Sequence, residues 1–319
     1  MDNFWEKLNK PFTVLAPMDD VTDNVFRKVV NETARPDVFF TEFTSADGLS
    51  SKGQSTVMRK LKFEQDQHPI VAQIWSNNPL KMEKAAKIIS KMGFDGIDIN
   101  MGCPSRSIVK KCAGAGMIGK YDLAKSIIDA VKKGAPNMPI SVKTRLGINK
   151  NIADEWVTFL LNQNLAALTI HGRTAMQMSK GNADWDEIAK IVEIKNKVSR
   201  ETLIIGNGDV KSYSEVIEKY EKYNVDGVMI GRGIFTNPWI FDKKEIVHER
   251  QDYFDMLLKH LDIFEKENKG RNFKKIFSPL KKFFKMYIMN FEGANEFRIK
   301  LMETSNPNEV REMLRVFTK

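Results

Sequence analysis

Segments that predict strands alternate along the chain with segments that predict helices, and this alternation restricts the possible folds more than any other feature. Eight strand-like segments lie between residues 12 and 231 of the 319-residue chain. They cover residues 12–17, 38–42, 69–75, 96–100, 139–145, 166–171, 202–206 and 226–231. Strands that alternate with helical segments predict a parallel sheet, and eight such units are typical of the TIM (β/α)8 barrel. A doubly wound sheet is the alternative, but no Gly-x-Gly-x-x-Gly turn follows the first strand.

The pattern changes after the eighth strand, because only helical segments follow it. Residues 251–267 and 273–290 predict amphipathic helices, and a last helix is expected to begin at Asn306. We therefore expect two domains: a TIM barrel over residues 1–244 and a small all-helical domain over residues 245–319.

Charge and cysteine content narrow the classes of function. The net charge of +9 and the pI near 9.3 favour a polyanionic partner. Two cysteines do not make a disulfide framework, which indicates a reducing compartment. No signal peptide is recognised, and no apolar run reaches the roughly 18 residues that span a bilayer. We expect a soluble cytoplasmic protein with no membrane partner, and we take it to be a monomer.

The fourth strand-like segment ends in a turn that contains a cysteine. Gly102 and Pro104 break the strand, so Cys103 lies in a tight turn at its carboxyl end, close to Asn100. A lone cysteine is usually a small buried hydrophobe. A Cys-Pro turn directly after a strand favours a functional thiol instead, because TIM barrels place functional groups at the carboxyl ends of their strands.

Two further strand ends carry candidate functional groups. Lys143, on the fifth strand, needs an anion or an electron-rich acceptor to offset the cost of its desolvation. His171 ends the sixth strand, where a purely structural imidazole is the alternative. No other metal ligand lies at a suitable spacing near it, so we expect no metal.

The loops after the seventh and eighth strands predict a phosphate site. They contain residues 206–209 (Gly-Asn-Gly-Asp) and residues 231–233 (Gly-Arg-Gly). In TIM barrels these two loops commonly bind phosphate through backbone N–H groups, which glycines allow to approach closely. Each glycine alone is explained by a turn, but both loops together, with Asn207 and Arg232, favour phosphate binding.

These segments together resemble the motifs of the tRNA-dihydrouridine synthases. The resemblance rests on residues 16–18 (Ala-Pro-Met), 41–42 (Thr-Glu), 100–104 (Asn-Met-Gly-Cys-Pro), 143–145 (Lys-Thr-Arg), 171–174 (His-Gly-Arg-Thr), 206–209 and 231–233. It extends over residues 11–241 in the expected order. It implies an FMN-binding TIM barrel and a helical domain that together reduce the C5=C6 bond of selected uridines in tRNA. NADPH is the implied reductant of the flavin.

The resemblance also implies roles for individual residues. FMN contacts are implied for Pro17, Met18, Gln73, Lys143, His171, Asn207, Gly208, Asp209, Gly231 and Arg232. Substrate contacts are implied for Asn100, Arg145 and Arg173 in the barrel, and we add Lys274, Lys281, Lys282 and Lys285 in the helical domain. Cys103 is the expected catalytic residue.

The chemistry is consistent with this role of the thiol. Hydride delivered to C6 of uracil pushes charge toward the C4 carbonyl, and C5 then needs a proton. A thiol with a pKa of ~8.5 is mostly protonated at neutral pH, so Cys103 is a suitable general acid. Lys143 and His171 are expected to stabilise the developing negative charge, and Asn100 to orient the base edge. Cys112, where the family usually has glycine, is the rival acid, but no strand-end asparagine or proline accompanies it.

The helical domain contains a strongly basic stretch. Residues 268–291 include seven basic side chains and no acidic one. The apolar positions at helical spacing, which should face the core, are Ile276, Phe277, Leu280, Phe283, Phe284 and Tyr287. The lysines then form a surface that favours RNA phosphates, since a merely solvated face would normally mix both signs.

Two other functions remain as alternatives. An FMN barrel that acts on a small free pyrimidine would not need the basic helical stretch. An RNA-binding protein without chemistry would not need Cys103, Lys143, His171 and both phosphate loops.

Overall fold

The computed structural model describes residues 3–199 and 201–317, and the chain divides into two compact units. The first consists of Met1–Asn24, Pro36–Val210 and Ser214–Gly231; the second of Val25–Arg35, Lys211–Tyr213 and Arg232–Lys319. Helix α1 (Asn24–Thr33) therefore groups with the carboxyl-terminal helices. The division into domains 1–244 and 245–319 stays a prediction.

The first unit is a parallel barrel. Its strands are β1 (Phe12–Leu15), β2 (Phe39–Phe40), β3 (Thr44–Ser45), β4 (Ile70–Trp75), β5 (Gly96–Met101), β6 (Ile140–Arg145), β7 (Ala167–His171), β8 (Leu203–Asn207) and β9 (Gly227–Ile230). They pair in the order β1-β9-β8-β7-β6-β5-β4-β2, and β3 also pairs with β4. A parallel bridge between Val14 and Val38 joins β1 to the chain just before β2. The TIM-barrel prediction is confirmed.

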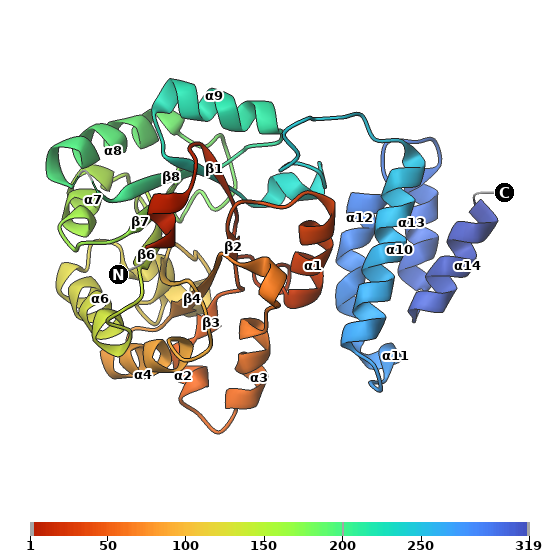
Figure 1. Cartoon of the computed structure of the whole chain (residues 1–319), viewed down its shortest axis with the longest axis horizontal. Helices are drawn as coiled ribbons and strands as arrows, with labels where there is room; N and C mark the ends of the chain where they lie inside the picture. The colour runs from red at the N-terminus through yellow and green to blue at the C-terminus, as the bar shows by residue number, and fades with distance from the viewer. Residues whose placement is uncertain (1–2, 200, 318–319) are drawn as a thin grey trace. The chain divides into compact units, whose positions relative to one another are not determined.

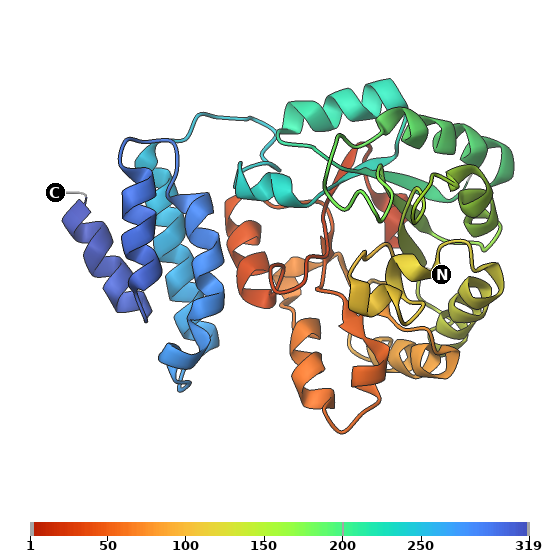
Figure 2. The same ribbon diagram turned by 180° about the vertical axis from the view of Figure 1, so that it is seen from behind.

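The helices of this unit surround the strands (Figures 1 and 2). They are α2 (Ala46–Leu49), α3 (Gln54–Met58), α4 (Pro79–Ile89), α5 (Arg106–Val109), α6 (Tyr121–Gly134), α7 (Ala153–Leu161), α8 (Trp185–Val198) and α9 (Tyr213–Tyr223). Local chemistry sets their ends: α4 begins where Asn78 Oδ1 accepts a hydrogen bond from Lys81 N and Pro79 occupies the first turn. The short helices α2, α3 and α5 were not predicted.

The barrel interior contains an apolar cluster and a group of buried polar side chains. Val14, Val71, Ile205 and Met229 belong to one buried cluster with Trp5, whose ring lies against the first residues of the strands. Buried polar side chains on the neighbouring strands β4, β5 and β6 are Gln73, Asp98, Asn100 and Ser141. These polar side chains lie on β4 and on the two strands, β5 and β6, that carry Asn100 and Lys143.

The second unit is helical. Besides α1 it contains α10 (Arg250–Glu267), α11 (Phe273–Ile276), α12 (Phe284–Tyr287), α13 (Ala294–Glu303) and α14 (Pro307–Phe317). Phe26 of α1 stacks on Phe283 at a centroid distance of 4.8 Å, and Lys28 Nζ forms an ion pair with Glu267 at 2.6 Å. These contacts explain why α1 groups with the carboxyl-terminal helices.

The prediction of one continuous helix over residues 273–290 is wrong. A 3-10 segment, Ser278–Phe283, separates α11 from α12. Pro279 lies in its first turn and has no N–H to donate to a carbonyl of the preceding turn. The apolar side is nevertheless inside, because Phe277, Leu280, Phe283, Phe284 and Tyr287 are buried as predicted, while Ile276 is half-buried. In the part of the chain that the structure describes, no helix has the length and apolar character of a membrane span.

Candidate active site

The Cys103 turn is held from three sides. Asn100 Oδ1 accepts hydrogen bonds from the backbone N–H groups of Gly102 (3.1 Å) and Cys103 (2.9 Å). Arg145 Nε donates to Gly102 O at 2.8 Å, and Ala115 N donates to Cys103 O at 3.0 Å. Cys103 itself is only half-buried, so the turn presents a thiol whose position is fixed by its backbone.

The environment keeps this thiol protonated. Burial raises the pKa of Cys103 above its ordinary value, and the Ser105 backbone N–H and the Arg145 charge only partly oppose that shift. A thiol that is neutral at physiological pH has a proton to donate. The geometry therefore suits an acid better than a nucleophile.

Lys143 lies on the neighbouring strand, in register with Asn100. Its Nζ donates to Asn207 Oδ1 at 2.9 Å, and Asn207 Nδ2 in turn donates to Met229 O at 2.8 Å. Burial, reinforced by the Arg145 charge, lowers the pKa of Lys143 to about 7. The amine therefore exchanges between its charged and neutral forms near physiological pH, and an anion placed beside it would favour the charged form.

His171 and Arg173 form a second group at the end of β7. Arg173 Nη1 lies 3.2 Å from His171 Nε2, and because a guanidinium only donates, this ring nitrogen accepts. The imidazole is then the neutral tautomer with its proton on Nδ1. Arg173 also forms an ion pair with Asp209, donates to Gly181 O at 2.6 Å and is 1% exposed.

Both predicted substrate arginines are therefore engaged with the protein itself. Arg145 uses Nη1 to bind the carbonyls of Thr174 (3.1 Å) and Met178 (3.0 Å) in addition to its bond to Gly102. Together with Arg173 it ties the loop after β7 to the neighbouring strand ends. These contacts favour a role in shaping the site, and a direct substrate contact of either residue stays a prediction.

The two predicted phosphate loops differ in what their glycines do. A Cβ at Gly208, where φ is +137°, would lie 2.4 Å from Ala183 Cβ, so protein packing alone requires glycine there. A Cβ at Gly231 would meet only Ala16 Cβ at 3.6 Å and Met18 Sδ at 3.7 Å, which are ordinary contacts. Packing does not require the glycine at position 231, which is consistent with a loop that admits a ligand. Pairing of β1 with β9 places Met18 beside this loop.

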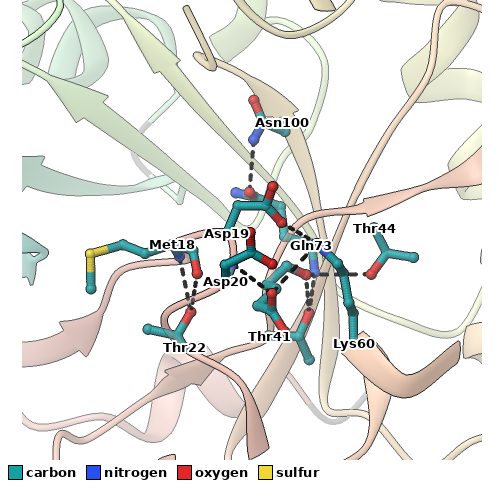
Figure 3. A network of polar contacts seen from close by, with 10 residues as sticks. Met18, Asp19, Asp20, Thr22, Thr41, Thr44, Lys60, Gln73 and Asn100 are labelled. Carbon is teal, nitrogen blue, oxygen red and sulfur yellow. Dashed lines mark hydrogen bonds and ion pairs between the residues drawn. The ribbon is translucent and has the colours of Figure 1, made fainter. Parts of the chain in front are cut away.

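An acidic cluster that sequence reasoning missed lies on the segments that follow β1 and β2. Figure 3 labels Asp19 and Asp20 of this cluster, and Lys60 beside them. The carboxylates of Asp19, Asp20 and Glu42 approach one another within 4.8 Å. Lys60 Nζ forms ion pairs with Asp19 and, at 3.5 Å, with Glu42, so one ammonium partly offsets the negative charge of the cluster. Burial raises the pKa of Glu42 despite the Lys60 charge. Of these residues only Glu42, within the Thr-Glu pair, had been singled out in the sequence.

The four lysines of the helical unit that were predicted to contact the substrate differ in their surroundings. Lys281 Nζ donates to Met302 O at 2.7 Å, near the end of α13, and so interacts favourably with that helix terminus. Lys282 and Lys285 are exposed, and both line a groove of about 520 Å³ whose lining also includes Lys281, Arg298 and the acidic Glu296. The side chain of the remaining predicted residue, Lys274, lies outside the described residues. The structure therefore favours Lys282 and Lys285 as the accessible cations.

Comparison with known proteins identifies the family. The family model described as "Dihydrouridine synthase (Dus)" matches residues 14–319. The chain is 44% identical over 320 residues to a "Probable tRNA-dihydrouridine synthase" of Staphylococcus aureus (strain Mu50 / ATCC 700699), covering 99% of this chain and 96% of that protein. It is 42% identical over 320 residues to "Probable tRNA-dihydrouridine synthase 2" of Bacillus subtilis (strain 168), covering 100% and 97%.

A solved structure of a variant of NCR from Zymomonas mobilis shares the fold. Its TM-score is 0.51 at 16% identity, over 75% of this chain and 88% of that one. The family model and the two relatives extend over nearly the whole chain, including the helical unit. The chain belongs to the dihydrouridine synthase family.

Proposed function

We propose that this protein reduces uridines in tRNA to 5,6-dihydrouridine at the mouth of its barrel, with FMN as cofactor and NADPH as the source of electrons. The observation that carries the proposal is a half-buried thiol, whose pKa burial raises, in a strand-end turn beside a lysine of lowered pKa. The names of the relatives point to the same substrate. We expect the protein to act in the cytoplasm as a monomer.

The residues present fit an anionic flavin. Lys143 offers a buried amine that an anion would hold in its charged form, and Gly231 leaves space beside Met18. The residues that would hold FMN are Pro17, Met18, Gln73, Lys143, His171, Asn207, Gly208, Asp209, Gly231 and Arg232. For Arg232 the phosphate role rests on its place in the sequence directly after Gly231. Reduced FMN, regenerated by NADPH, would supply the hydride that C6 of the uracil receives.

Cys103 would complete the reduction by donating its Sγ proton to C5. Hydride at C6 and a proton at C5 together add one H₂ across the double bond, so the step is balanced. The thiolate that remains is stabilised by the charges of Arg145 and Lys143, both of which lower the pKa of Cys103. Asn100 would act through the turn, because its oxygen binds the Gly102 and Cys103 N–H groups and its Nδ2 donates to Gln73 Oε1 at 2.8 Å.

The substrate must reach this thiol from within a folded RNA. A target uridine has to leave its stack to enter an active site, at a cost of a few kcal/mol. The exposed Lys282 and Lys285 would bind the RNA backbone and help to offset that cost.

Substitution of the thiol tests the proposal. We expect Cys103→Ala to retain flavin, seen in the visible absorption spectrum, and to lose about 10²–10⁴ in the rate of dihydrouridine formation from reduced enzyme. Cys112→Ser is the matched control and should keep the wild-type rate. Full activity of Cys103→Ala would show that Cys103 is not the general acid. A purified wild-type protein that does not bind flavin would indicate an RNA-binding function without redox chemistry.

A further inference from the structure

A buried carboxylate, Asp98, lies on β5, the strand that leads into the Cys103 turn. Asp98 is the central residue of β5 that stands in register with Gln73 on β4 and with Ser141 on β6. Gln73 Nε2 donates to Asp98 Oδ2 at 2.7 Å and Ser141 Oγ donates to Asp98 Oδ1 at 2.6 Å. The side chain has no exposed surface, so its contacts are with the protein interior.

A chain of hydrogen bonds runs from this carboxylate to the backbone of the turn. An ionised carboxylate only accepts, so Gln73 must direct its NH₂ group toward Asp98 and its Oε1 the other way. Gln73 Oε1 accepts from Asn100 Nδ2 at 2.8 Å, which directs Asn100 Oδ1 toward the N–H groups of Gly102 and Cys103. Backbone N–H groups only donate, so both ends of the chain require the same direction for both amides. Figure 3 shows the Gln73–Asn100 part of this chain.

A charge at this position costs free energy that an apolar side chain would not. Burial raises the pKa of Asp98 to about 6, although the bonds from Ser141 and Gln73 and the charge of Lys143 oppose the shift. Filling the barrel interior alone would be achieved at least as well by a hydrophobic residue. The carboxylate therefore contributes something other than packing: it sets the direction of the Gln73 amide, so that Gln73 Oε1 faces Asn100 Nδ2.

We propose that Asp98 is a positioning residue that fixes the orientation of the Cys103 turn through Gln73 and Asn100. The proposal rests on the proposed function only in that Cys103 must be the acid for the positioning to affect the reaction. The positioning itself is a property of the thiol and can be measured without substrate. Asp98 touches neither the thiol nor any reacting atom, and it acts through two intervening amides.

Loss of the negative charge removes the preference for one direction of Gln73. An amide at position 98 can accept from Gln73 or donate to it, so both orientations of Gln73 become possible. When Gln73 turns its NH₂ group toward Asn100 Nδ2, Asn100 loses either its bond to Gln73 or its bonds to the Gly102 and Cys103 N–H groups. Protonation of Asp98 has the same effect at acid pH. The groups that face Asp98 are Gln73 on β4 and Ser141 and Lys143 on β6, and of these only Lys143 is charged.

The test uses Cys112→Ser protein, so that Cys103 is the single thiol, and compares three variants. Asp98→Asn removes the fixed direction. Ser141→Ala removes a hydrogen bond to the same carboxylate on the side away from the turn. Asp98→Asn combined with Asn100→Asp exchanges the carboxylate and the amide at the two ends of the Gln73 side chain. Each hydrogen bond of the series can then form again if the Gln73 amide turns around.

Two quantities are measured: alkylation of Cys103 by iodoacetamide, expressed per thiolate from its pH dependence, and the kinetics of uridine reduction. We expect Asp98→Asn to change alkylation several-fold and to lower kcat about tenfold, with KM for tRNA within about twofold. Ser141→Ala should leave both close to wild type. The reversed double variant should return alkylation toward the wild-type value, while circular dichroism shows that all three proteins are folded.

Several results would overturn the positioning role. These are unchanged alkylation in Asp98→Asn, an equal effect of Ser141→Ala, or no recovery in the reversed variant. Changed alkylation with an unchanged kcat would support the positioning and instead remove Cys103 from the reaction. Failure of the inference and failure of the proposed function are thus separate outcomes.

Discussion

At the scale of single residues, the strand ends of the barrel show how strongly one environment can change a common side chain. Lys143 and Cys103 lie on adjacent strand ends, and burial is the largest influence on both. It raises the pKa of the thiol and lowers that of the amine. Both groups are therefore closer to their neutral forms at physiological pH than they would be in water, so the thiol has a proton to donate and the amine gains its charge when an anion lies beside it.

The amine provides a pH-dependent prediction. With a pKa of about 7, Lys143 is charged below that pH and neutral above it, so attraction for an anionic flavin falls as the pH rises through this value. Bound flavin itself favours the charged form, which shifts the loss of the Lys143 charge to a higher pH. We expect the dissociation constant of FMN, followed by flavin fluorescence, to increase with pH in the wild type.

Lys143→Met should bind FMN more weakly at low pH and show a flat profile. Lys132→Met is the control, because burial also lowers the pKa of Lys132, which lies on α6 and was not assigned to the site. A flat wild-type profile would show that Lys143 does not contact the cofactor.

At the scale of elements, the helices around the barrel depend on close backbone approach as well as on apolar packing. Helices α4 and α6 pack together, and a Cβ at Gly134 would lie only 2.3 Å from Glu83 O and 2.9 Å from Ala86 Cβ. The glycine at the end of α6 thus allows the two helices to approach. In the helical unit, Pro279 lies where the α-helical geometry between α11 and α12 is interrupted, and the apolar side chains on both sides of it are still buried.

Gly134→Ala should therefore destabilise the protein. Because backbone atoms cannot move away as easily as a flexible side chain, we expect a loss of about 1–3 kcal/mol in the free energy of unfolding, measured by denaturant titration. Gly53→Ala is the matched control: a Cβ there meets only Ser51 Oγ at 3.5 Å, so its effect should stay within about 0.5 kcal/mol. Equal effects of the two substitutions would contradict the close-approach explanation.

At the scale of the whole molecule, some basic side chains are engaged in contacts within the protein and others are exposed to solvent. Basic side chains in the barrel such as Arg145 and Arg173 are buried in protein contacts, and Lys281 of the helical unit contacts the end of α13. Lys282 and Lys285 are exposed, in a stretch without acidic residues. The net charge of +9 therefore predicts a polyanionic partner only through those cations that the fold leaves accessible.

Charge reversal of these two lysines tests their role in RNA binding. Lys282→Glu with Lys285→Glu should weaken tRNA binding strongly at low salt and reduce the slope of log K against log salt by about two, one for each lost phosphate contact. Filter binding at several salt concentrations measures both. Lys84→Glu with Lys87→Glu makes the same change on exposed positions of α4 and should have a smaller effect. Equal effects would mean that only net charge matters.

The sequence alone determined the barrel, the place of Cys103 after the fourth predicted strand and the buried face of the carboxyl-terminal helices, because strand and helix periodicity and turn residues act locally. Tertiary structure decided which polar groups meet. Asn100 and Arg145 look like substrate contacts in the sequence, yet they bind the backbone of the Cys103 turn. The sequence predicted no role for Asp98, although strand register places it beside Gln73 and Ser141. A side chain's partners depend on strand register and on distant segments, and local patterns carry no record of either.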